Sequence, residues 1–212
     1  MVIIQQNDIR PGYYIFLLQY KDGTRIDLSF RSIREVHDAV KEDSLTKVLL
    51  DKGNILKNVP KPDEKSYHIK EPSPEKWDKC LNELLWIPIC IMKAIKRDEI
   101  PLVQFYYANC FLPEIGKLAA WYAGSLKNWE INTGKGNKWI QRYLDKKTYN
   151  DYIRLFFYSD NKDIIKNLDT ARELIRSLSS EICKKTGYEY PHQYDKNTEE
   201  FLKKFNMIYK TE

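Results

Sequence analysis

The chain has 212 residues, of which 42% are hydrophobic, 31% charged and 13% aromatic. This composition excludes a largely disordered chain and allows one large domain or two small ones. The net charge of +5 comes from 35 basic and 30 acidic residues that are interspersed. Such a balance allows an anionic ligand such as a nucleotide, but it is not the footprint of a nucleic-acid-binding protein, so we expect no nucleic-acid partner.

The four cysteines lie far apart without a C-x-x-C pair, and the three histidines show no metal-binding spacing. We therefore interpret the cysteines as reduced thiols of a cytoplasmic protein. We expect no signal peptide and no membrane segment, because the apolar run 84–94 is too short to span a bilayer and contains Pro88.

The first strong pattern is a β-hairpin over residues 13–30, with a short strand over 2–6 before it. Asp22-Gly23 marks a tight turn, because Gly23 tolerates the positive φ that a primed turn requires. In the second arm the apolar side chains alternate with polar ones, and Asp27 falls mid-strand on the polar face. A solvated aspartate is the simpler interpretation, although aspartate is a poor strand residue.

After the hairpin, Ser32 and Glu35 form a capping-box pattern that predicts a helix to about residue 41. Residues 44–50 predict a second short helix, ended by Gly53. Residues 54–74 are polar and contain four prolines, with one strand-like patch at 67–69, so they predict a connection between two parts.

From residue 74 onward the pattern is helical, and the expected fold class is α+β, with about three strands followed by a helical bundle. Ser73 and Pro74 mark the start of the first long helix. Asp98 is the expected cap of the second, which we expect to be interrupted near Pro113. The predicted helices are 75–96, 98–121, 138–144, 147–158, 160–186 and a last one that begins at Asp195 or Asn197 and ends at 209.

One face of the first long helix carries a mixed set of polar and aromatic side chains. Glu83 borders this face, and Glu99 follows at the next helix start. Such a face suits a charged, hydroxyl-rich ligand, but spacing alone favours a solvated face with ordinary ion pairs. Its members are Asn82, Trp86, Lys93 and Arg97.

The loop 133–138 is a glycine-lysine cluster that includes Lys135 and Lys138. Backbone N–H groups and ammonium charges in such a loop can face phosphates. It is not a Walker A loop, since no G-x-x-x-x-G-K-[ST] motif occurs, and a surface turn before a helix is the simpler interpretation.

Taken in order, a series of short motifs resembles the streptomycin (aminoglycoside) 6-adenylyltransferases, which are nucleotidyltransferases of the polymerase-β type. Each motif is weak alone, and their order over almost the whole chain makes the resemblance specific. They are RIDLSF (25–30), VLLDK (48–52), Pro72-Ser73, Asp78, Asn82-Glu83, Lys93, Arg97 to Ile100, Trp121, Gly134-Lys135, Lys138, Arg142 to Leu144 and Tyr190-Pro191.

The resemblance implies transfer of AMP from Mg-ATP to a hydroxyl of streptomycin or a similar aminoglycoside, and hence antibiotic resistance. It implies a partial nucleotidyltransferase α/β domain (1–58), a linker (59–73) and a helical substrate-binding domain (74–212). In the family, three carboxylates hold Mg²⁺ against the triphosphate.

By the same resemblance, Asp27 is the third carboxylate, either a metal ligand or the base for the attacking hydroxyl. The matched lysines are candidates for the nucleotide phosphates, namely Lys93, Lys135 and Lys138. The candidates for a cationic drug are Asn82, Glu83, Trp86 and Glu99.

The sequence departs from the family pattern in two places. It contains no G-S-R motif and no D-x-D, which supply the first two carboxylates in the family, so we expect this chain alone to have little or no transferase activity. Phe105 stands where the family has an acidic residue near the drug, which puts the identity of the drug in doubt.

A sheet without the preceding strands would have an open edge and an uncovered apolar face, so we expect self-association through it. A second hypothesis is a non-catalytic helical module that binds a ligand or another protein. A third is a helical structural protein that binds neither nucleotide nor drug.

Overall fold

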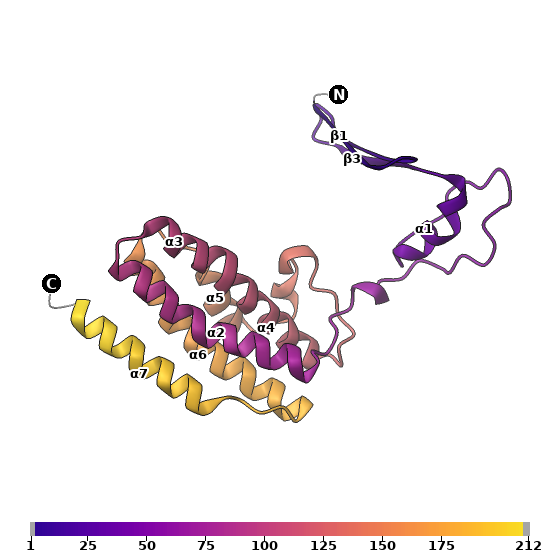
Figure 1. The fold of residues 1–212 in the computed structure, drawn as a ribbon. Helices are drawn as coiled ribbons and strands as arrows, with labels where there is room; N and C mark the ends of the chain where they lie inside the picture. Colours follow the sequence, from indigo (N-terminus) through magenta and orange to yellow (C-terminus); the bar gives the residue numbers. More distant parts are fainter. Residues whose placement is uncertain (1–2, 210–212) are drawn as a thin grey trace. The chain divides into compact units, whose positions relative to one another are not determined.

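A computed structural model of the chain describes residues 3–209 and confirms the α+β class. The chain divides into two compact units, Met1–Ser66 and Tyr67–Glu212, and the division falls inside the expected linker. Figure 1 shows strands in the first unit and helices in the second. In the part of the chain that is described, no helix is long and apolar enough to cross a membrane.

The first unit is built on a three-stranded antiparallel sheet in the order β1-β2-β3. Its strands are β1 (Ile3–Arg10), β2 (Tyr13–Gln19) and β3 (Arg25–Arg31). β1 runs further than expected, since the sequence predicted a loop from residue 7. Gly23 has the expected positive φ of 85°, but the turn is a three-residue loop in which Tyr20 and Thr24 still pair through their backbones.

The apolar face of this sheet is open at β3, where its side chains are about half exposed: Ile26 45%, Leu28 41% and Phe30 53%. Among residues 11–66, no side chain is buried. The three-stranded sheet with an apolar face open to solvent is therefore as expected, whereas self-association through it stays a prediction.

The rest of the first unit is less regular than the sequence predicted. Ser32 does cap a helical start, but the first turn is the 3-10 segment η1 (Ile33–Glu35), and α1 follows (Val36–Glu42). The helix predicted over 44–50 is absent: residues 44–45 form a turn and 46–50 are irregular. The patch at 67–69 is not a strand either: Tyr67 is the last residue of the 3-10 turn η2 (Lys65–Tyr67), and 68–69 form a bend and irregular chain.

The second unit begins with α2 (Pro74–Lys96), which starts where the sequence predicted. The Ser73 hydroxyl accepts a hydrogen bond from the backbone N–H of Lys76 at 3.4 Å, and Pro74 occupies the first helical position. Pro88 lies in the helix interior without ending it. One face of α2 is buried along its whole length and forms one wall of the core.

The next helical stretch consists of α3 (Ile100–Gln104), the π-helical segment η3 (Phe105–Phe111) and α4 (Leu112–Ser125). Its N-cap is Glu99 rather than the predicted Asp98, which has a positive φ of 54°. The predicted interruption near Pro113 takes the form of the π-helix. Because proline has no N–H and its ring clashes with the preceding turn, a wider turn just before it relieves the conflict.

A glycine-bearing loop connects α4 to two short 3-10 turns, η4 (Lys135–Asn137) and η5 (Ile140–Arg142), and then to α5 (Lys146–Arg154). The sequence predicted a full helix over 138–144 and a longer one over 147–158. Residues 155–156 instead form a turn and 157–158 are irregular, and the Leu155 carbonyl accepts a hydrogen bond from the buried Tyr107 hydroxyl at 2.7 Å.

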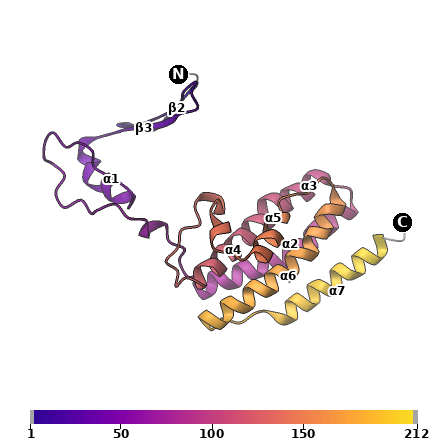
Figure 2. The ribbon, with the colours of Figure 1, turned by 180° about the vertical axis from the view of Figure 1, so that it is seen from behind.

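The last two helices are α6 (Asn161–Thr186) and α7 (His192–Tyr209). Asp160 caps α6 and Gly187 ends it at φ 75°, both as predicted. Figures 1 and 2 show α7 alongside α2 and α6, and α7 packs directly on α2, as α4 does on α6. α7 begins at His192, before the predicted start, because Asp195 makes a tertiary ion pair instead of capping it.

The hydrophobic core lies between α2, η3, α4, α6 and α7. Trp77, Tyr107, Ile115, Ile164 and Leu178 are among its members that are at most 1% exposed. The core therefore lies wholly within the helical unit, which gives the side chains on that unit a rigid support.

Candidate functional site

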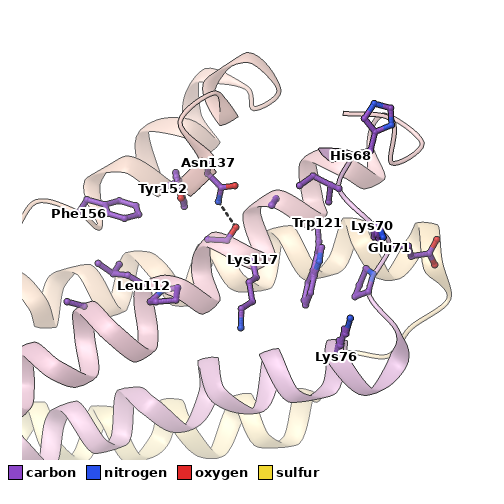
Figure 3. A pocket seen from close by; sticks show the side chains of 17 residues that line it. His68, Lys70, Glu71, Lys76, Leu112, Lys117, Trp121, Asn137, Tyr152 and Phe156 are labelled. Atoms are coloured by element: carbon purple, nitrogen blue, oxygen red, sulfur yellow. Dashed lines mark hydrogen bonds between the residues drawn. The ribbon is translucent and has the colours of Figure 1, made fainter. Parts of the chain in front are cut away.

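A cavity of about 730 Å³ lies on the helical unit, within the size range of small-molecule sites. Five segments line it: residues 68–72 before α2, the first turn of α2, the η3–α4 helix, the loop at 136–137, and α5 with the two residues after it. Its walls are mainly apolar and aromatic, with Leu112, Trp121, Tyr152 and Phe156 among them. Figure 3 shows how these side chains lie around the opening.

Three lysines from separate segments meet at this cavity. Figure 3 shows Lys76 on α2 and Lys117 on α4 extending into the space between the two helices, beside Trp121. Lys70 lines the cavity from the segment before α2, and Glu71 is the one acidic side chain in its lining. Lys117 is paired with Glu114 at 2.5 Å, on its own helix.

The cavity walls are held by hydrogen bonds from several segments. The Asn137 amide donates to the Gly116 carbonyl at 2.8 Å and accepts from the Thr133 hydroxyl at 2.9 Å. The backbone N–H of Ile69 donates to the Ile131 carbonyl at 2.8 Å. Burial raises the pKa of the Tyr152 hydroxyl, so it remains protonated and able to donate a hydrogen bond. The cavity is therefore preformed.

A second groove, of about 410 Å³, runs between α2 and α7. It brings the predicted drug-binding residues Asn82 and Trp86 together with Tyr194 and Asn197 of α7. Trp86 and Tyr194 are 57% and 65% exposed, so two aromatic surfaces face solvent at its rim. The groove lining contains no charged side chain, and this suits the apolar face and hydroxyls of a sugar ring better than a cationic group.

The two predicted drug-binding carboxylates do not line this groove. Glu83 lies toward Cys90 and Cys110, whose thiols have raised pKa values, first through burial and also through the negative charge of Glu83. Glu99 is paired with Arg97 at 2.8 Å at the α2–α3 junction. The structure therefore separates the predicted carboxylates from the predicted amide and indole.

The three lysines predicted to hold phosphates are also not gathered at one place. Lys93 is exposed on α2, next to Cys90. Lys135 and Lys138 flank Gly136 and Asn137, which line both the larger cavity and a neighbouring one of about 320 Å³. Lys138 lines the smaller cavity, with its ammonium 4.5 Å from the centre of the Trp139 ring.

Asp27 lies on β3 in the first unit, opposite Leu17. Its carboxylate accepts two hydrogen bonds from the Arg25 guanidinium, at 2.8 and 3.0 Å, which lower the pKa of Asp27. Among the described residues, no group of three histidine, cysteine or acidic side chains could hold a metal ion. The donor set present therefore does not fit the Mg²⁺ site that the resemblance implies, in which several carboxylates surround the metal.

Sequence reasoning missed the lysines at the larger cavity. Lys70 and Lys76 come from different elements, and Lys117 is one of several exposed lysines on helices, so no spacing pattern connects the three. Pro72 and Trp121, which also line the cavity, were among the residues that carried the family resemblance, but neither of them was assigned a role from the sequence.

The fold has a counterpart among solved structures. A crystal structure of an aminoglycoside 6-adenyltransferase from Bacillus subtilis superposes with a TM-score of 0.60 and 24% identity, over 97% of this chain and 78% of that one. The streptomycin adenylyltransferase family model matches residues 2–205. The chain therefore belongs to the streptomycin adenylyltransferase family.

Similar curated proteins are the aminoglycoside 6-adenylyltransferases of Bacillus subtilis (28% identity over 87% of this chain) and Staphylococcus aureus (26% over 90%). The chain covers 65% and 67% of the lengths of these relatives. The chain thus spans about two thirds of the length of the relatives that it matches.

Proposed function

We propose that the protein acts in adenylyl transfer, from ATP with Mg²⁺ to a hydroxyl of streptomycin or a similar aminoglycoside, and so in antibiotic resistance in the cytoplasm. The observation that supports this proposal is the family match over residues 2–205. Within this function, we assign substrate binding to the helical unit, which we propose as the drug-binding domain, with the small sheet as part of a nucleotidyltransferase domain.

These 212 residues are not expected to catalyse the transfer by themselves. Asp27 is paired with Arg25, and the described residues bring no further carboxylates to it. A lone carboxylate cannot hold metal ions against the repulsion of a triphosphate. The pairing with Arg25 and the lack of further carboxylates nearby among the described residues do not support the metal-binding or catalytic role that the resemblance implied for Asp27.

We propose Asn82 and Trp86, which line the groove between α2 and α7, as drug-binding residues. Glu83 and Glu99 are further proposed drug-binding residues on the helical unit, although they do not line this groove. An exposed indole provides a flat apolar surface for a sugar ring, and the amide provides hydrogen bonds for its hydroxyls. Guanidinium groups of the drug require carboxylates, and Glu83 and Glu99 are the proposed ones.

The test combines a transfer assay with a binding measurement on the purified 212-residue chain. Radiolabelled AMP transfer from Mg-ATP to streptomycin is expected to be absent, while calorimetry is expected to show streptomycin binding. Trp86→Ala should weaken that binding about fivefold, because the lost ring contact is worth about 1 kcal/mol. Phe157→Ala, at another exposed aromatic residue of the helical unit, is the control and should leave the affinity unchanged.

The results also separate the proposal from its alternative, a non-catalytic binding module, which is favoured by the lack of a carboxylate cluster among residues 3–209. Binding of both streptomycin and ATP supports the enzyme role, whereas drug binding without ATP binding supports the module. Robust AMP transfer would contradict the expectation for the isolated chain. Binding of neither ligand would contradict the proposed function and favour a structural helical protein.

A further inference from the structure

The larger cavity, between α2 and α4, has a basic lining made by lysines that are not among the predicted site residues. Two ammonium groups, those of Lys70 and Lys76, line it without an ion-pair partner among residues 3–209. Lys117 adds a third ammonium group, which Glu114 neutralises in part. Charged groups of the same sign around a cavity repel each other, and an anionic ligand relieves that repulsion.

The one acidic side chain in the lining does not offset this charge. In Figure 3 the carboxylate of Glu71 is directed away from Lys76 and Lys117. The segment that carries Lys70 and Glu71 is held in place, because the Tyr188 hydroxyl donates to the Pro72 carbonyl at 2.8 Å. The arrangement of the lysines is thus a property of the fold and not of a free loop.

The rest of the lining is suited to a planar, partly apolar group. Trp121 stands next to Lys76 and Lys117 (Figure 3) and is supported from behind by Trp77, with ring centres 6.4 Å apart. Trp77 is itself 1% exposed and donates a hydrogen bond to the Glu189 carbonyl at 2.9 Å. Trp121 therefore presents a fixed aromatic surface beside the ammonium groups.

We propose that this cavity binds a nucleoside polyphosphate, with the phosphates on Lys70, Lys76 and Lys117 and the base or sugar against the Trp121 wall. Ammonium groups bind phosphate oxygens as point charges, and an aromatic wall next to them favours a nucleotide over a free polyphosphate. The choice of a nucleotide rests on the proposed function, whereas the preference for a polyphosphate rests on the lysines alone. The site differs from Lys93, Lys135 and Lys138, which the family resemblance suggested.

The test is a calorimetric titration of the 212-residue chain with ATP, pyrophosphate and adenosine, in EDTA and at low salt, without any aminoglycoside. ATP is expected to bind about tenfold more tightly than pyrophosphate, and adenosine more weakly than ATP. The double variant Lys70→Gln/Lys76→Gln should weaken the binding of ATP and of pyrophosphate about tenfold or more, because charge-assisted hydrogen bonds are lost. ATP affinity should also fall as salt is raised.

The control is Lys79→Gln, an exposed lysine on α2 that does not line the cavity. It should bind ATP as the unmodified chain does. Both substitutions are at exposed positions, and equal thermal midpoints will establish that the variants are folded. The proposal is overturned if ATP affinity is the same in the double variant and in the control, or if neither ATP nor pyrophosphate binds at millimolar concentration.

Equal affinity for ATP and pyrophosphate would overturn the assignment of the ligand as a nucleotide. None of these measurements involves streptomycin, so a failure here leaves the result of the drug-binding experiment standing. Conversely, a chain that binds ATP through Lys70 and Lys76 but binds no aminoglycoside would contradict the proposed function and support this cavity.

Discussion

At the residue scale, a single arginine on α6 organises the contact with α7. Arg176 binds the Asp195 carboxylate with two hydrogen bonds of 2.6 and 3.1 Å and the Glu199 carboxylate with one of 2.6 Å. Asp195 is 4% exposed, and removing Arg176 would leave a buried carboxylate without its partner, which is strongly destabilising. Lys203 is a second partner of Glu199. The ion pairs therefore join two helices that are separated by a loop in the sequence.

This network predicts a loss of stability in acid. The hydrogen bond from Arg176, followed by that from Lys203, lowers the pKa of Glu199 from 4.5 to about 2. A carboxylate whose pKa is depressed by folding contributes its full stabilisation above the unfolded pKa, and loses it as the pH falls toward the folded pKa. Glu199→Gln should therefore be less stable than the unmodified chain at pH 6, with the difference shrinking between pH 4.5 and pH 2.

Urea unfolding of both proteins over this pH range measures the effect. Glu181→Gln is the matched control, since Glu181 is in an exposed pair with Lys184 on one helix and contributes little. A stability difference between Glu199→Gln and the unmodified chain that does not change with pH would contradict the role assigned to the ionised carboxylate.

At the element scale, α4 contains two glycines that serve different purposes. A Cβ on Gly124 would lie 2.8 Å from the Trp129 ring and 3.0 Å from the Ile69 side chain. A Cβ on Gly116 would lie 3.4 Å from the Asn137 amide, which is an ordinary contact. Trp129 itself has a positive φ of 64°, which a bulky residue rarely adopts, so packing on Gly124 helps to hold it there.

These contacts predict opposite effects for the same substitution in one helix. Gly124→Ala should destabilise the protein by about 1–2 kcal/mol, because overpacking against Trp129 and Ile69 outweighs the gain in helix propensity. Gly116→Ala should stabilise it by about 0.5 kcal/mol, since alanine favours the helix and the added methyl group is accommodated. Chemical denaturation of both variants checks the pair. Equal changes of the same sign would show that Trp129 does not constrain position 124.

Pro113 also affects the shape of the helix in which it lies. The backbone N–H of Leu112 donates to the Tyr107 carbonyl five residues back, directly before Pro113. The resulting π-turn also positions Ala108 and Leu112 in the lining of the larger cavity. A helix irregularity thus contributes to the shape of the proposed ligand site.

At the scale of the whole molecule, the two units differ in how they are stabilised. The fully buried apolar side chains of the described chain lie between Trp77 and Leu202, all in the helical unit. The sheet of the first unit has an apolar face that is about half exposed. The helical unit therefore carries its own core, whereas the sheet presents a surface that favours association.

A fragment of residues 67–212 tests this difference. It should fold by itself with a thermal midpoint within about 2 °C of that of the full chain, because no core residue is removed. The full chain should associate as its concentration rises, and the fragment should stay monomeric, as measured by analytical ultracentrifugation. An unfolded fragment, or a fragment that associates as strongly as the full chain, would contradict the prediction.

The sequence predicted best those features of the fold that depend only on residues close together in the chain. The positive φ of Gly23, the Ser73 cap and the Gly187 helix end each depend on contacts within a few residues, and all three were predicted. The helix expected over 44–50 did not form, because none of its side chains is buried and helical propensity alone is too weak for a short segment.

The sequence predicted less of the candidate site than of the fold. Spacing along α2 did predict that Asn82 and Trp86 share a face, and α7 completes the groove beside them. The amino-acid sequence by itself determined the fold class, the family and the ends of the two longest helices, α2 and α6, since these depend on patterns between near neighbours in the chain. Only the tertiary structure brought Lys70, Lys76 and Lys117 to one cavity and Asp195 to Arg176, because packing decides which distant segments meet.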